Sequence, residues 1–152
     1  MRPIEYFKLQ AKNLFRDYKT QSSYIDDVDG NSYYKYDPAY FDIDGIFVDY
    51  DWDEENFSLM KAQHLIALMV GFRKWTDLLK ASEAELELAK LLFDNQDKIS
   101  LDEWEMYIAD AEGDNKTTFD PASKIDIFKQ VFLNVEGHSS PFPDYRLNKR
   151  SG

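Results

Sequence analysis

Four aspartates about a third of the way along the chain, Asp42, Asp49, Asp51 and Asp53, are the side chains best suited to chemistry. The last three are spaced two residues apart, which would place them on one face of a β-strand. Carboxylates arranged in this way can bind Mg²⁺ or Ca²⁺, act as an acid–base pair, or attract a basic protein surface. No histidine pair or phosphate-binding loop accompanies them, so we expect no catalytic residue, no metal and no other cofactor. A metal-binding or hydrolytic site that uses these aspartates is the alternative.

Residues 93–104 resemble part of a calcium-binding EF-hand. Asp94, Asp97 and Glu103 match acidic ligands of such a loop, and Ile99 matches its central isoleucine. The loop is about two residues shorter than the twelve that an EF-hand uses, and the glycine of its sharp turn is missing. The segment also fits an ordinary connection between two helices, which is the interpretation we adopt.

A β-hairpin is expected to position the four aspartates. Asp44-Gly45 between two runs of alternating residues is typical of a two-residue hairpin turn, because such turns need a positive φ. Pairing across that turn gives one face for the core, made of Ala39, Phe41, Ile43, Ile46, Val48, Tyr50 and Trp52. The opposite face would bind a partner. Its residues are Tyr40, Asp42, Phe47, Asp49, Asp51 and Asp53.

Another hairpin is predicted just before this one, over residues 24–36, with Asp29-Gly30 as its turn. Together the two would form a small antiparallel meander inserted at about residues 22–56. Residues 21–56 contain eleven acidic residues and one basic residue, so they carry −10 of the net charge of −11. This asymmetry argues against a nucleic acid partner, since phosphates would be repelled, and favours a basic protein surface. Acids that only keep the sheet soluble are the alternative.

Helices are expected on both sides of this acidic insert. The first runs from Pro3 to about Tyr18 or Lys19, with apolar residues at helical spacing. Four more begin after side chains that are typical of helix N-caps, and a short helix around Trp75 lies among them. The four predicted N-caps are Ser58, Ser82, Ser100 and Asp120.

The composition indicates one folded domain rather than a disordered chain. Of the 152 residues, 43% are hydrophobic and 16% are aromatic. There is no cysteine, which suits a reducing cytoplasm. We find neither a signal peptide nor an apolar run long enough to span a membrane, so we expect a cytoplasmic protein with no membrane partner. Residues 1–137 should form a single α+β domain, and residues 138–152 an irregular tail.

Two blocks of the sequence resemble a small bacterial helical domain. Residues 8–14 read Lys-Leu-Gln-Ala-Lys-Asn-Leu, and residues 62–78 contain Ala-Gln-His-Leu-Ile-Ala and Gly-Phe-Arg-Lys-Trp-Thr-Asp-Leu. The family pattern is Lys-x-Gln-Ala-Lys-x-Leu, then Ala-Gln-x-x-Ile-Ala, then Gly-Phe-x-x-Trp-x-x-Leu. The domain occurs beside ankyrin-repeat and glyoxalase-like regions of bacterial proteins. The resemblance implies a helical scaffold and no particular activity.

The sequence thus predicts an α+β fold of about six helices, with a small antiparallel β-meander inserted after the first helix. For function we expect a non-catalytic binding or inhibitor protein whose acidic, aromatic face docks on a basic protein surface. An immunity protein against a secreted toxin, or a phage or mobile-element antagonist of a nucleic-acid-binding surface, would fit this description. An accessory scaffold domain is a further alternative.

Overall fold

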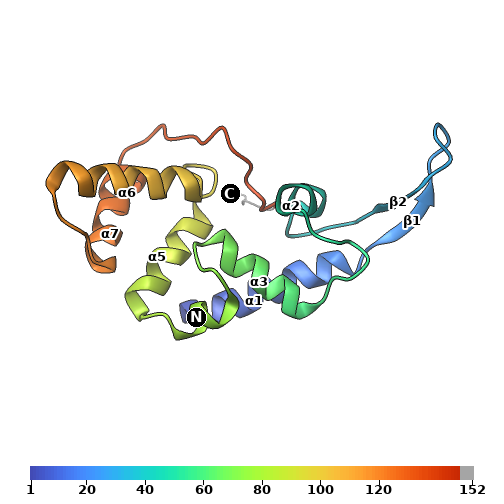
Figure 1. Ribbon diagram of the computed structural model, residues 1–152, viewed down its shortest axis with the longest axis horizontal. Helices are drawn as coiled ribbons and strands as arrows, with labels where there is room; N and C mark the ends of the chain where they lie inside the picture. The colour runs from blue at the N-terminus through green and yellow to red at the C-terminus, as the bar shows by residue number, and fades with distance from the viewer. Residues whose placement is uncertain (148–152) are drawn as a thin grey trace.

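The computed structural model describes residues 1–147 and shows an α+β fold, which confirms the predicted class (Figure 1). Within this range, seven α-helices and one π-helical turn accompany a two-stranded antiparallel sheet that follows the first helix. The elements are α1 Pro3–Tyr18, β1 Ser22–Ile25, β2 Ser32–Lys35, α2 Ile43–Tyr50, α3 Leu59–Met69, α4 Trp75–Lys80, α5 Glu83–Asp94, α6 Leu101–Asn115, α7 Pro121–Phe128 and the π-helical turn η1 Lys129–Leu133. None of the helices in these residues is long and apolar enough to cross a membrane.

The buried apolar side chains form two clusters. The first lies between α1, α2, α3 and α5 and includes Phe7, Leu14, Ile46 and Leu65. The second joins α5 to α6, α7 and η1 and includes Trp104. Each large apolar side chain that is fully buried contributes about 1.5–3 kcal/mol. Helix α5 takes part in both clusters, and Figure 1 shows it between the end with α6 and α7 and the rest of the molecule.

Four helices begin at the side chains predicted to be their N-caps. Ser82 and Ser100 each form the predicted capping box with the glutamate three residues later, which satisfies backbone N–H groups at the starts of α5 and α6. Ser58 and Asp120 accept a hydrogen bond from a first-turn N–H of α3 and α7. The starts of these helices are therefore confirmed.

The predicted hairpin around Asp44-Gly45 is wrong, because these two residues lie in the first turn of α2. The side chain of Asp42 is the N-cap of this helix, and its Oδ1 accepts a hydrogen bond from the N–H of Gly45 at 3.2 Å. The β-structure of the fold is therefore the first of the two predicted hairpins, β1–β2, and a helix follows it.

Helix α2 buries different side chains from those that the predicted strands would have buried. Ile43, Ile46 and Phe47 are buried at the i, i+3, i+4 spacing of an amphipathic helix. Val48, predicted to face the core, is 78% exposed. Ile43 and Ile46 belong to the core in either conformation, so the sequence identified them correctly even though it assigned the wrong element.

The Asp42→Ala variant is expected to lower the free energy of unfolding by about 1 kcal/mol, because it removes the N-cap of α2. Urea unfolding followed by far-UV circular dichroism measures this change. The control is Asp42→Ser, which keeps a capping oxygen and should retain most of the stability. Equal stability of the alanine and serine variants would show that the cap does not hold α2.

A buried carboxylate of α1 fixes the chain just before α2. The side chain of Asp17 accepts hydrogen bonds from three consecutive backbone N–H groups, those of Ala39, Tyr40 and Phe41, at 2.8–2.9 Å. Asp17 is 1% exposed. A carboxylate that accepts three N–H groups replaces the hydration it loses on burial, and here it ties two segments that are distant in sequence.

The C-terminal segment, residues 138–147, returns from η1 to α2 and contains no regular helix or strand. Phe41 and Arg146 form an isolated antiparallel bridge. On either side of it, the N–H of Asp42 donates to the carbonyl of Tyr145 and the N–H of Leu147 donates to the carbonyl of Tyr40, each at 2.9 Å. Residues 148–152 of the predicted tail lie outside the described residues.

Candidate binding surface

The structure separates the six residues that were predicted to share one binding face. Phe47 is only 6% exposed and packs in the first core cluster, so its assignment to a partner-binding face is wrong. Tyr40 is half-buried against the same cluster. Asp42 is half-buried at the start of α2, where it acts as the cap. The residues that remain exposed are Asp49, Asp51 and Asp53.

The three exposed aspartates lie in the last turn of α2 and just beyond it. Asp49 Oδ2 accepts a hydrogen bond from the hydroxyl of Tyr145 at 2.7 Å. Asp51 ends the helix in the left-handed conformation, with a φ of 53°. The amide of Asn56 donates to Asp53 at 2.7 Å, and this bond, together with a backbone N–H, holds the pKa of Asp53 below its usual range. Asp53 is therefore ionised at neutral pH.

These charges oppose the local helix dipole. Carboxylates near a helix C-terminus are unfavourable by about 0.3–1 kcal/mol, and the last turn of α2 carries no basic residue to offset Asp49 and Asp51. Stability of α2 thus does not explain why acids occupy these positions.

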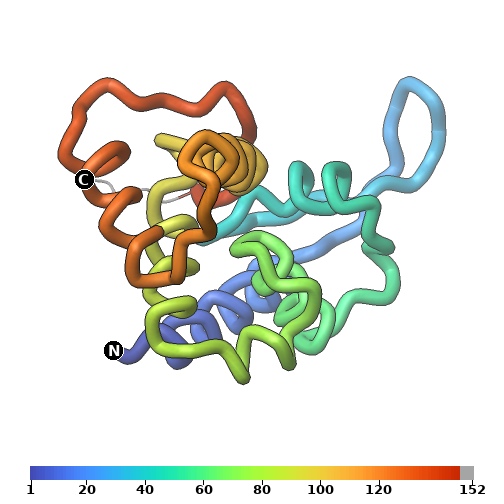
Figure 2. The backbone as a smooth tube through the Cα atoms, turned by 60° about the vertical axis from the view of Figure 1, so that its left-hand side comes forward, coloured from blue at the N-terminus to red at the C-terminus, as the bar shows by residue number. Residues whose placement is uncertain are grey.

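The hairpin β1–β2 projects from the body of the molecule. We call residues 22–35 the acidic arm. All four residues of β1 are exposed, and in β2 only Tyr34 is partly covered. The strands pair from Ser22 with Lys35 to Ile25 with Ser32. Figures 1 and 2 show the arm standing clear of every helix in two different views.

The tip of the acidic arm combines apolar and acidic side chains. Val28 is 96% exposed, and its neighbours Asp27 and Asp29 are exposed as well. Asp29 accepts hydrogen bonds from the hydroxyl of Tyr33 and the N–H of Asn31, and these bonds hold its pKa below the usual range, with Tyr33 the larger cause. The tip therefore presents an apolar side chain between two carboxylates, and that of Asp29 is held in its charged form.

The base of the acidic arm rests on the acidic segment that follows α2. The hydroxyl of Tyr36 donates to Glu54 Oε1 at 2.6 Å, and Gln21 Nε2 donates to the Tyr36 hydroxyl at 2.9 Å. Burial and the bond to Glu54 raise the pKa of Tyr36, so this phenol stays neutral. The hydroxyl of Tyr34 donates to Glu55 Oε1 at 3.2 Å. The arm and the residues after α2 therefore form one connected acidic surface.

The sequence predicted a hairpin over residues 24–36, but it did not identify the tip of this hairpin as a binding surface. The strands read Ser-Ser-Tyr-Ile and Ser-Tyr-Tyr-Lys, and neither alternates apolar with polar residues. A strand that packs one face on a core shows that alternation. Its absence is the signal that could have identified a hairpin exposed on both faces.

The carboxylates of residues 1–147 form no cluster of metal-ligand type. Among residues 1–147, no group of three histidine, aspartate, glutamate or cysteine side chains is arranged to hold a metal ion. The acids of the EF-hand-like segment are bonded to other side chains instead. Asp94, Asp97 and Glu103 are bonded to Lys90, Arg146 and Ser140, respectively.

Comparisons with models of protein families, with curated proteins and with solved structures found no match for this chain. The resemblance of residues 8–14 and 62–78 to a bacterial helical domain therefore stays a prediction. Those residues lie in α1 and in the stretch from α3 to α4.

Proposed function

We propose that this protein is a non-catalytic binding protein whose acidic arm docks on a basic surface of another protein. The observation that carries this proposal is the projecting hairpin with Val28 at its tip, 96% exposed between Asp27 and Asp29. We also propose that it acts in the cytoplasm, which the lack of cysteine suits.

The arm has the chemistry of a docking element rather than of a stabilising one. Its strands bury almost nothing against the helices, and a two-stranded hairpin on its own is marginally stable in water. Tyr24 and Tyr33, whose rings lie 6.1 Å apart across the pair, offer contact area with few rotatable bonds. Ile25, 70% exposed, adds apolar area next to the acids. A basic partner would gain burial and charge pairing from the same surface.

The remaining acids extend this surface toward α2. Glu54 and Glu55 touch the base of the arm, while Asp51 and Asp53 follow α2. A basic partner would also relieve the unfavourable charge at the C-terminal end of α2. An immunity protein, or an antagonist that covers the nucleic-acid-binding surface of another protein, would fit such an acidic docking face.

Neutralising the tip should remove partner binding. The variant Asp26→Asn/Asp27→Asn/Asp29→Asn keeps one side-chain oxygen at each of the three positions and removes three charges. Wild type and variant, immobilised and exposed to extract of the native host, are compared by mass spectrometry over a series of salt concentrations. We expect wild type to retain a basic protein that elutes as salt rises, and the variant to bind it about tenfold more weakly.

The matched control is Asp110→Asn/Asp114→Asn/Asp126→Asn, which removes three exposed charges from α6 and α7 at the other end of the molecule. It should bind as wild type does. If both variants lose partner binding equally, the loss depends on overall charge and not on the arm. That result would support solubility as the role of the acids. Equal retention in both would overturn the proposal that the arm is the docking element.

A further inference from the structure

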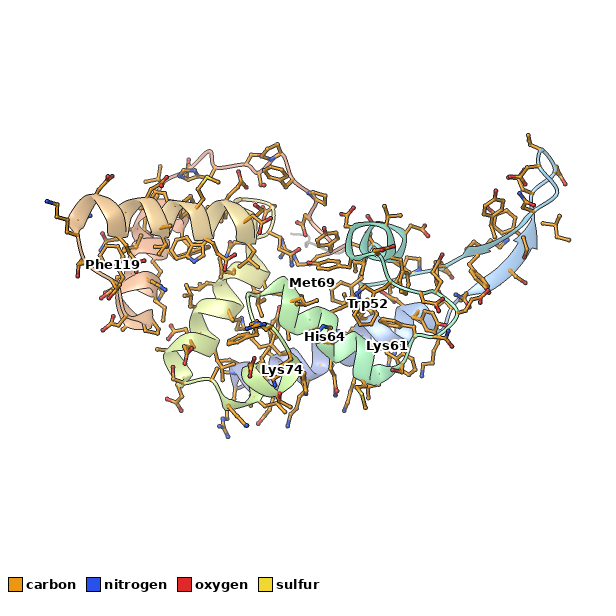
Figure 3. All side chains as sticks on the ribbon, in the orientation of Figure 1. Trp52, Lys61, His64, Met69, Lys74 and Phe119 are labelled. Carbon is orange, nitrogen blue, oxygen red and sulfur yellow. The ribbon has the colours of Figure 1, made fainter. Side chains whose placement is uncertain are left out.

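A cleft of about 470 Å³ lies between the C-terminal segment and the helical body, well away from the acidic arm. Leu68 and Met69 of α3 and Leu101 of α6 supply apolar lining. Figure 3 labels Met69 on α3, on the side toward the C-terminal segment. Phe142 and Tyr145 of that segment form the opposite wall. The volume is within the range of small-molecule sites.

The charges that line this cleft all have one sign. Asp49 and Asp102 line it, and no lysine, arginine or histidine does so among the described residues. Asp49 Oδ2 accepts the Tyr145 hydroxyl, while Oδ1 has no hydrogen-bond partner within residues 1–147. The other large cleft, between α5, α6 and α7, differs because Lys124 stands there among glutamates. The first cleft thus combines apolar lining with two carboxylates and, within residues 1–147, no basic side chain.

Two tyrosines add a second attraction for a cation. The rings of Tyr50 and Tyr145 lie 5.7 Å apart at an angle of 53°, so they form two walls of a corner. Burial, with smaller contributions from the charges of Asp102 and Asp49, raises the pKa of Tyr50 to about 12. The phenol is thus neutral and lies within the field of both carboxylates. Aromatic faces next to carboxylates recognise ammonium groups through cation–π and charge attraction.

We propose that this cleft binds a small organic cation, with its ammonium group at Asp102, Asp49 and the ring of Tyr50 and its apolar chain along Leu68 and Leu101. The C-terminal segment closes one side, which limits the occupant to a small molecule rather than a folded partner. This site is separate from the acidic arm, so the proposal of cation binding does not depend on the proposed protein partner.

The test titrates the protein with hexyltrimethylammonium in a calorimeter and compares it with 1-hexanol, which has the chain without the charge. We expect one cation per chain with a Kd at or below about 1 mM, and binding of the alcohol at least about tenfold weaker. No saturable binding of the cation, or equal binding of the two probes, would overturn the proposal.

Two variants locate the site. Asp102→Asn removes a lining charge and Tyr50→Leu removes an aromatic wall while keeping apolar bulk; each should weaken cation binding about fivefold to tenfold. Asp110→Asn, which removes another exposed charge farther along α6, is the control and should bind as wild type does. Far-UV circular dichroism confirms that each variant is folded. If Asp102→Asn and Asp110→Asn bind equally, the cation lies elsewhere and the assignment is wrong.

Discussion

Replacing Asp17 by alanine is expected to lower the free energy of unfolding by about 4 kcal/mol, because three backbone N–H groups lose their acceptor together. Asp17 Oδ1 accepts from the N–H of Ala39 at 2.9 Å, and Oδ2 accepts from the N–H groups of Tyr40 and Phe41 at 2.8 Å each. A buried donor left without an acceptor costs about 1–3 kcal/mol. Phe41 is 1% exposed, so its N–H cannot turn to water unless this part of the chain moves.

Urea unfolding measures the loss, and two further variants show its cause. Asp17→Asn keeps one carbonyl oxygen in nearly the same volume and should lose about half as much stability as the alanine variant. Asp110→Ala removes an exposed carboxylate of α6 and should change stability by less than about 0.5 kcal/mol. A loss in Asp17→Ala no larger than in Asp110→Ala would show that the carboxylate does not hold this turn.

Two local patterns compete in the stretch that forms α2, which was mistaken for a hairpin. Within residues 38–53, strand alternation and helical spacing both fit, since Ile43 and Ile46 face the core in either case. When only the neighbouring residues are considered, the Asp44-Gly45 pair favours a hairpin turn. The bonds that hold residues 39–42, just before α2, come from α1 and from the C-terminal segment, at sequence separations that no local pattern reveals.

The starts of α3, α5, α6 and α7 were predicted correctly because their determinants are local, whereas the equally local cap of α2 at Asp42 was missed. Ser82, Ser100 and Asp120 each accept a hydrogen bond from an N–H only three residues away, so the cap and its partner stand in the same short stretch of sequence. The α+β class follows from the same kind of signal, since the β1–β2 hairpin also forms between neighbours.

The candidate surface was predicted in part for a related reason. Acidic charge can be counted without a structure, and Asp49, Asp51 and Asp53 are indeed exposed. Which face Phe47 takes depends on whether residue 47 lies in a helix or a strand, and that error moved a core residue onto the surface. The projection of the arm depends on what the helices leave uncovered, which composition cannot indicate.

Arg146→Ala is expected to detach the C-terminal segment at a cost of about 2–3 kcal/mol, because the guanidinium makes four charged hydrogen bonds. Nη1 donates to the carbonyl of Asp94 at 2.7 Å, Nη2 to Asp97 at 3.2 Å, and Nε and Nη2 together to Asp144 at 3.1 and 3.0 Å. The Arg146 side chain is 16% exposed. Hydrogen exchange of the N–H of Asp42, which donates to Tyr145, should accelerate about 100-fold.

The remaining question about Arg146 is whether its planar shape or its charge fixes the segment. Arg146→Lys keeps the charge but cannot span Asp144 and the Asp94 carbonyl at once, so its exchange rate should fall between wild type and alanine. Asp97→Asn removes the most exposed of the contacts, on a carboxylate side chain that is 55% exposed, and should change stability by less than about 1 kcal/mol. Tyr145 lines the cleft that we propose to bind a small organic cation, so release of the segment should also weaken binding of hexyltrimethylammonium. Unchanged exchange at Asp42 in the alanine variant would show that the backbone bonds around Phe41 hold the segment without the guanidinium.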